Sequence, residues 1–138
     1  MTRYLLDTNV ILHLVNRAKG YELIEQRLAT SSATSVRVCV ITVWEIFRLA
    51  EKAKVPTKAS LAALDMLRQF RVVPMTQQAA ARGGQLHAAL ANKGLTIGER
   101  DSMIAGIALE NGFTIVTDNT KEFVRVPTLP IENWRVAK

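Results

Sequence analysis

The sequence predicts an α/β fold in which a mostly parallel sheet is covered by helices on both faces. Short β-branched segments alternate along the chain with longer segments whose apolar residues recur at helical spacing. A strand, a helix and a second strand form a right-handed crossover, which makes neighbouring strands parallel. The chain has 138 residues, of which 49% are hydrophobic and 22% charged, and this composition suits a single globular domain over residues 1–138.

The predicted strands are short and rich in apolar side chains. The second and fourth are apolar enough to be buried on both faces of the sheet. Strands are expected at residues 3–6, 36–41, 71–75, 113–117 and, from a weaker pattern, 129–132.

Helices are expected in the segments between these strands. They are predicted at residues 8–15, 21–28, 42–54, 57–70, 77–93 and 98–111. Threonine is the expected N-cap of three of them and glycine the expected end of two, at Thr8, Thr42, Thr57, Gly94 and Gly112. Gly83 and Gly84 lie inside an alanine-rich helix, where each costs about 1 kcal/mol relative to alanine, so a kink or break is expected there.

Cysteine usage and hydropathy exclude several classes of protein. Cys39 is the only cysteine, so the chain forms no internal disulfide and no thiolate metal site. No run of about 18 apolar residues could span a membrane. Asp7 interrupts the apolar N-terminal run before a secretory signal could form. We therefore expect a protein of the reducing cytoplasm, without a membrane partner.

Four acidic residues follow the predicted strands closely. Asp7 comes directly after the first strand and Asp118 directly after the fourth, while Glu45 lies one helical turn beyond the second. Asp101 is in the first turn of the helix expected at 98–111. Because ligands bind parallel sheets at the carboxyl ends of the strands, all four carboxylates are expected at one edge.

Such a cluster requires protons or a cation. Two carboxylates about 4 Å apart repel each other by about 4 kcal/mol at an effective dielectric of about 20. With no thiolate and only two histidines in the chain, the fitting cation is Mg²⁺ or Mn²⁺, held by carboxylates, waters and substrate phosphate oxygens. That cation would join the cluster to phosphodiester hydrolysis.

Each acid also has a purely structural explanation. Asp7 could cap the next helix, and Glu45 could form a capping box with Thr42. Asp101 is favoured by the helix macrodipole in any case, and Asp118 is an ordinary turn residue. The functional interpretation therefore depends on all four acids reaching one edge of the sheet.

Polar and basic residues around the acids are candidate supporting groups. Those expected to orient the carboxylates or bound water are Thr8, Asn9, Ser102, Thr117 and Asn119. The net charge of +6 favours an anionic partner, nucleic acid first. The basic residues expected to hold an RNA backbone are Arg48, Lys52, Arg100 and Lys121. Trp44 is expected in the core or at an interface.

These motifs resemble those of PIN-domain ribonucleases and, more narrowly, the VapC toxins of bacterial toxin–antitoxin modules. The resemblance rests on Leu-Leu-Asp-Thr-Asn-Val-Ile at 5–11, on Glu45 after a β-branched strand, on Ile-Gly-Glu-Arg-Asp at 97–101 and on the segment 115–123 around Asp118. It runs nearly end to end, as far as Ile-Glu-Asn-Trp at 131–134.

The resemblance implies a three-layer α/β/α PIN fold and an Mg²⁺- or Mn²⁺-dependent endoribonuclease. It implies cleavage of RNA, with tRNA as a candidate substrate, and inhibition of translation until a VapB-like antitoxin covers the active site. It also implies toxin homodimers within that complex. The metal-binding and catalytic positions carry over as Asp7, Glu45, Asp101 and Asp118.

The chain departs from the family pattern at two positions near these acids. Glu99 stands where close relatives often have proline, and Asp118 stands where many have asparagine. Two other functions remain open: a catalytically silent PIN-fold RNA-binding regulatory module and a PIN-like nuclease acting on DNA. The complete acid set disfavours the first, and 138 residues leave little room for the duplex-holding additions that the second needs.

Overall fold

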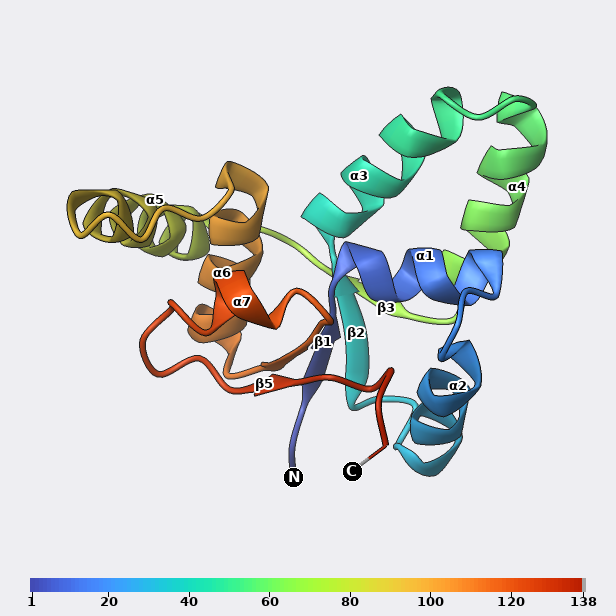
Figure 1. The fold of residues 1–138 in the computed structure, drawn as a ribbon, viewed down its shortest axis with the longest axis horizontal. Helices are drawn as coiled ribbons and strands as arrows, with labels where there is room; N and C mark the ends of the chain where they lie inside the picture. The colour runs from blue at the N-terminus through green and yellow to red at the C-terminus, as the bar shows by residue number, and fades with distance from the viewer. Residues whose placement is uncertain (138) are drawn as a thin grey trace.

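A computed structural model describes residues 1–137, which fold around a sheet of parallel strands (Figure 1). The strands are β1 Tyr4–Leu6, β2 Val36–Cys39, β3 Arg71–Val73, β4 Thr114–Val116 and β5 Ile131–Glu132. They pair in the order β3-β2-β1-β4-β5, and every pairing is parallel. The predicted parallel sheet is confirmed, although each strand is shorter than expected at one or both ends.

Helices cover both faces of this sheet. They are α1 Thr8–Asn16, α2 Tyr21–Thr30, α3 Val40–Glu51, α4 Pro56–Leu67, α5 Gln77–Asn92, α6 Glu99–Asn111 and α7 Thr120–Phe123. Figure 1 shows α1–α4 on one side and α5–α7 on the other. The predicted three-layer α/β/α fold is therefore confirmed. Among residues 1–137, no helix combines the length and apolarity needed to cross a bilayer.

Alternating side chains of the central strands build a separate core on each face. Leu5 and Ile115 pack with α5 and α6, whereas Leu6 and Val116 pack with α1 and α3. Successive side chains of a strand point to opposite faces of the sheet. Because helices cover both faces, all four side chains are fully buried. This is why the strands are apolar throughout rather than alternating with polar residues.

The chain reverses direction across the sheet at β1. The first crossovers add β2 and then β3 on one side of β1, and the next adds β4 on its other side. Leu6 pairs with Val116, so Asp7 and Thr117 follow side by side at the carboxyl edge. Such a switch point leaves a crevice between the two connections, which is where open α/β sheets bind ligands.

The expected break at Gly83 and Gly84 is wrong, because α5 runs unbroken from Gln77 to Asn92. A Cβ on Gly83 would lie 2.8 Å from the carbonyl oxygen of Ser102, and one on Gly106 would lie 2.5 Å from that of Ala79. These two glycines therefore let the backbones of α5 and α6 approach closely. Gly84 has open space around it.

Two predicted N-caps are also wrong. α3 begins at Val40 and α4 at Pro56, so Thr42 and Thr57 lie inside the first turns of their helices. Proline suits the first position of a helix because an N–H is not needed there. The Thr42 hydroxyl is buried 3.2 Å from that of Thr8, so a tertiary contact replaces the expected cap.

Of the other predicted helix ends, one N-cap is wrong and two C-terminal glycines are confirmed. Asp7, not Thr8, caps α1, and its Oδ1 accepts a hydrogen bond from the Thr8 backbone N–H at 2.8 Å. Gly94 follows α5 and Gly112 ends α6 as expected, each in the left-handed region. The four-residue α7 was not predicted.

Candidate active site

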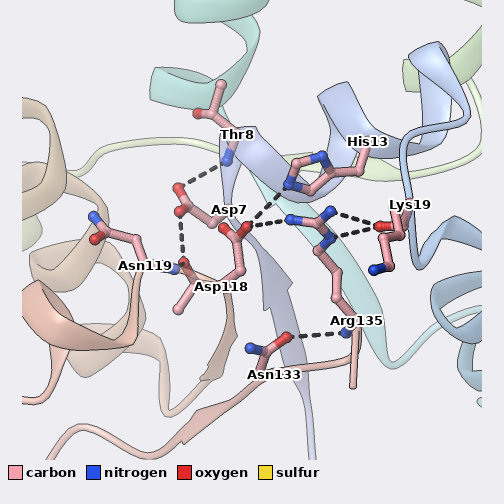
Figure 2. A network of polar contacts seen from close by, with 9 residues as sticks. Asp7, Thr8, His13, Lys19, Asp118, Asn119, Asn133 and Arg135 are labelled. Atoms are coloured by element: carbon pink, nitrogen blue, oxygen red, sulfur yellow. Dashed lines mark hydrogen bonds and ion pairs between the residues drawn. The ribbon is translucent and has the colours of Figure 1, made fainter. Parts of the chain in front are cut away.

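Asp7 is the most buried acid at the switch point, with 3% of its surface exposed. Its Oδ1 caps α1, and its Oδ2 accepts a hydrogen bond from the Thr117 hydroxyl at 2.8 Å (Figure 2). The Thr117 oxygen in turn accepts a hydrogen bond from the Asn119 backbone N–H at 2.9 Å. The carboxylate is therefore held rigidly between the ends of β1 and β4.

Burial makes the Asp7 carboxyl a much weaker acid than usual. Loss of solvation raises its pKa to about 6, against the opposing effect of the hydrogen bonds from Thr117 and Thr8. The negative charges of Glu45 and Asp118 raise the pKa further. Asp7 is thus placed where a nearby cation would strongly favour its ionised form.

Glu45 reaches the same place from α3. Its Oε1 accepts a hydrogen bond from the Thr8 hydroxyl at 2.7 Å, and its Oε2 accepts one from Arg100 Nε at 3.0 Å. The capping box with Thr42 is therefore wrong, because the Glu45 side chain is directed towards Thr8 and Arg100 and not to the start of α3.

Asp101 in the first turn of α6 interacts with a neighbouring acid, Glu122, on α7. Burial raises its pKa to about 7, followed by its hydrogen bond with Glu122 and the charges of Asp7, Glu122 and Glu45. The pKa of Glu122 is lowered by hydrogen bonds from Asn119 and Asp101. Of these two acids, Asp101 is therefore the weaker.

Glu122 is the acid that the sequence analysis missed. It lies on α7, which is too short to show a helical pattern. Asn119 links the two acids, since its Nδ2 donates to Glu122 Oε2 at 2.6 Å and reaches Asp101 Oδ2 at 3.4 Å. The spacing of three residues between Asn119 and Glu122 was the one available signal, because a single helical turn brings such residues together.

One cavity brings most of the predicted residues together. Its volume is about 450 Å³, and three of the four acids, Asp7, Glu45 and Asp101, line it. Of the supporting and basic residues, those that line it are Thr8, Asn9, Asn119, Arg48 and Arg100. Lys52 and Lys121 are exposed and are not among the lining residues within 1–137.

Two predicted supporting residues have other positions. Thr117 acts on Asp7 from the buried end of β4, as expected of an orienting group. Ser102 lies outside the cavity and its hydroxyl donates to the carbonyl oxygen of Glu99 at 2.6 Å. Trp44 is not in the core, because 54% of its surface is exposed.

Asp118 follows β4 as predicted, but its carboxylate is directed elsewhere. Arg135 Nη1 donates to its Oδ2 at 2.7 Å, and His13 Nε2 lies 3.0 Å from the same oxygen (Figure 2). Partial burial opposes ionisation, but the hydrogen bonds from Arg135 and His13 outweigh it and hold the pKa of Asp118 below its usual range.

Arg135 joins Asp118 to the C-terminal segment and to the loop after α1. It also donates to the carbonyl oxygen of Lys19, from Nε at 3.1 Å and from Nη2 at 2.5 Å. Asp118 does not line the cavity in the described part of the chain, although its charge is felt by Asp7. Its catalytic role stays a prediction.

The donor set of the cavity fits a hard divalent cation. In the chain as described, no three acidic, histidine or cysteine side chains are arranged to enclose a metal ion by themselves. Mg²⁺ does not need such a cage, because it is usually bound through one or two carboxylates and keeps several waters. Asp7 and Asp101 bring carboxylate oxygens to the cavity, and burial together with neighbouring negative charges raises the pKa of each.

Comparison with known proteins places this arrangement in a family. The PIN domain family model matches residues 4–129. The chain is 34% identical over 136 residues to the tRNA(fMet)-specific endonuclease VapC of Salmonella typhimurium, covering 97% of this chain and 99% of the relative. It is 33% identical over 134 residues to ribonuclease VapC2 of Haemophilus influenzae, covering 97% and 99%.

Solved structures agree with the sequence relatives. The structure of DNA-bound VapBC from Salmonella typhimurium superposes with a TM-score of 0.89 at 33% identity, covering 97% of this chain and 99% of that one. VapBC-1 from nontypeable Haemophilus influenzae gives a TM-score of 0.86 at 26% identity, covering 98% and 100%. The chain therefore belongs to the PIN-domain family and, within it, to the VapC ribonucleases.

Proposed function

We propose that this chain is an Mg²⁺- or Mn²⁺-dependent endoribonuclease toxin that cleaves RNA and inhibits translation until an antitoxin binds it. The observation that carries the proposal is the cavity lined by Asp7, Glu45 and Asp101 at the switch point of the sheet. Three carboxylates that line one cavity repel one another, and their arrangement suits a cation that acts on phosphodiesters.

The acidic residues that line this cavity have different proposed roles. Asp7 and Asp101 would hold the cation, and Glu45, fixed by Thr8 and Arg100, would complete or orient its water shell. When bound, the cation supplies charge neutralisation at the phosphodiester and lowers the pKa of water. Because burial raises the pKa of Asp101 to about 7, protons would compete with a cation for this carboxylate.

Asp118 is proposed as the fourth acid of the set. Its charge raises the pKa of Asp7, so it adds negative potential to the site while its oxygens bind Arg135 and His13. Its contribution should accordingly be smaller than that of Asp7.

The substrate and the partner are proposed from the basic rim and from the relatives. Arg48 and Arg100 would contact RNA phosphates, with tRNA as the first candidate because one relative is named as a tRNA(fMet)-specific endonuclease. The related structures are VapBC complexes. An apolar groove of about 640 Å³ between α1, α3 and α4 shares Leu12 and Leu49 with the acidic cavity. An antitoxin segment in that groove would reach the acids, and we propose that two toxin copies join such a complex.

Purified protein and labelled nucleic acids test the proposal. Single-stranded RNA, total tRNA and flap DNA are incubated with Mg²⁺, with Mn²⁺ or with EDTA. RNA or tRNA should be cut only with a divalent cation, and Asp7→Asn should lower the rate about 100-fold or more, since several kcal/mol of charge stabilisation are lost. Asp65→Asn, a change at an exposed aspartate on α4, is the matched control and should cut at the wild-type rate.

Three results would contradict the proposal: cleavage in EDTA, an Asp7→Asn protein that cuts normally, or cleavage of flap DNA alone. In cells, induction with and without the neighbouring gene product identifies the antitoxin, since only a cognate partner should relieve growth arrest. Sequencing the 5′ ends of RNA fragments would then give the cut site.

A further inference from the structure

A large aromatic side chain is exposed beside the acidic cavity. Trp44 precedes Glu45 on α3 and is 54% exposed, whereas Trp134 is 1% exposed in the core. An indole ring is a large apolar surface that proteins usually bury or use in binding. Its position next to the site makes the Trp44 ring a candidate binding surface.

Two guanidinium groups lie over the Trp44 ring as cation–π contacts. Arg48 Cζ lies 5.5 Å from the ring centroid and Arg100 Cζ lies 5.6 Å from it. Arg48 Nε is buried without a hydrogen-bond partner among residues 1–137. Arg100 Nε is bound to Glu45, so one of the two cations touches an acid of the cavity.

The surface around Trp44 is continuous with the acidic cavity. Trp44 lines a hollow of about 330 Å³ together with Ile41 and Met103. Glu99 and Arg100 line both this hollow and the acidic cavity. A nucleic-acid strand whose phosphodiester lies at the acids could therefore place its next nucleotide on Trp44.

We propose that Trp44 is a stacking platform for a nucleobase adjacent to the scissile phosphodiester, with Arg48 and Arg100 contacting the flanking phosphates. This inference rests on the proposed function, because it takes RNA as the substrate. Proteins recognise single-stranded RNA by stacking unpaired bases on aromatic rings and arginine planes. An aromatic ring next to two cations offers a face for a base and charges for the neighbouring phosphates of such a strand.

Binding without cleavage gives the first test. An Asp7→Asn protein is titrated with a short single-stranded RNA and with an abasic strand of equal length, in Mg²⁺, while tryptophan fluorescence is recorded. Because Trp134 is buried, quenching reports on Trp44. The RNA should quench the emission, and the abasic strand should do so only weakly. Trp44→Ala should raise the Kd about 5- to 100-fold.

Two further variants separate stacking from general surface effects. Trp44→Phe keeps an aromatic face and should recover most of the affinity. Leu61→Ala removes a side chain of similar exposure on α4, 59%, and should leave the Kd unchanged. In an Asp7 wild-type background, Trp44→Ala should raise KM more than it lowers kcat, since the ring positions substrate and does not touch the reacting atoms.

An unchanged Kd in Trp44→Ala, or equal quenching by the abasic strand, would overturn the proposal. A dimer contact would also overturn it. In that case Trp44 emission would change on dilution of the wild-type protein, and Trp44→Ala would convert a wild-type dimer to a monomer. If wild-type protein cuts no RNA while RNA still quenches Trp44, the platform stands and the nuclease function fails.

Discussion

Ionised Asp7 destabilises the folded chain, although the proposed chemistry needs the ionised form. Burial raises the pKa of Asp7 from 3.8 to about 6, so the folded chain binds this proton more tightly than the unfolded chain. The stability that the proton contributes is complete below pH 3.8 and is lost as the pH rises through about 6. At pH 8 the loss amounts to about 3 kcal/mol.

Asp7→Asn should therefore be more stable than wild type at pH 8, by up to about 3 kcal/mol, and should lose this advantage near pH 4. Urea unfolding in EDTA between these pH values measures the difference. Asp101→Asn should behave in the same sense with its transition nearer pH 7, because the pKa of Asp101 is raised to about 7. Asp65→Asn, at an exposed aspartate, serves as the matched control. A gain in Asp7→Asn that did not depend on pH would refute the burial argument.

Asp118 should show the opposite pH dependence. Its pKa is held low in the folded chain by Arg135 and His13, so its contribution is present above the unfolded pKa and is lost as the pH falls through the folded one. Asp118→Asn should therefore lower the free energy of unfolding near pH 7, by about 1 kcal/mol, with the deficit shrinking below pH 4. RNA cleavage should fall about tenfold, less than in Asp7→Asn.

A double-mutant cycle with Arg135→Gln identifies the partner of Asp118. If the Asp118–Arg135 pair at 2.7 Å accounts for the loss of stability, the double variant should have a free energy of unfolding no lower than that of the less stable single variant. Additive losses would assign the stability of Asp118 to other contacts. A loss of cleavage as large as that of Asp7→Asn would show that Asp118 acts in the cavity itself.

At the scale of elements, the contact between α5 and α6 depends on one glycine of an adjacent pair. Gly83→Ala should destabilise the fold by about 1–3 kcal/mol, because its Cβ would press on the backbone of Ser102, which cannot turn aside. Gly84→Ala faces open space on the same helix and should stabilise it by about 0.5–1 kcal/mol. Unfolding free energies of the two variants give the comparison, and equal effects would contradict the close-packing explanation.

The elements that could be predicted are those whose pattern is local. Apolar runs and helical spacing gave the strands and the six longer helices. The caps at Thr42 and Thr57 failed because a tertiary contact and a proline determine where α3 and α4 begin. The break at Gly83 failed because the reason for the glycine lies in α6, far along the chain.

The candidate site was predictable to the extent that topology fixes it. A parallel sheet brings the residues that follow its strands to one edge, so Asp7 and Asp118 could be placed at the same edge from the sequence, whereas the direct pairing of β1 with β4 came from the structure. Side-chain direction could not be predicted, which is why the ion pair of Asp118 with Arg135 was not foreseen. Glu122 was missed because a four-residue helix leaves no period in the sequence.

At the scale of the whole molecule, the net charge of +6 conceals an uneven distribution. The acids of the cavity concentrate negative charge at one edge of the sheet, which leaves the remaining surface more basic than the net charge indicates. A basic surface favours association with RNA, and the acidic cavity favours a cation. The unfolded chain keeps the net charge but loses the cavity, so binding of a cation should be coupled to folding.

Mg²⁺ or Mn²⁺ should therefore raise the melting temperature of the wild-type chain. At about ten times its Kd the cation would stabilise the fold by about 1.4 kcal/mol, or roughly 3–6 °C for a chain of this size. The shift should be larger at pH 8 than at pH 6, because protons compete with the cation for Asp7 and Asp101. It should be absent in Asp7→Asn and intact in Asp65→Asn. Sodium chloride at equal ionic strength separates binding from screening, and an equal shift with that salt would mean that the cavity holds no divalent cation.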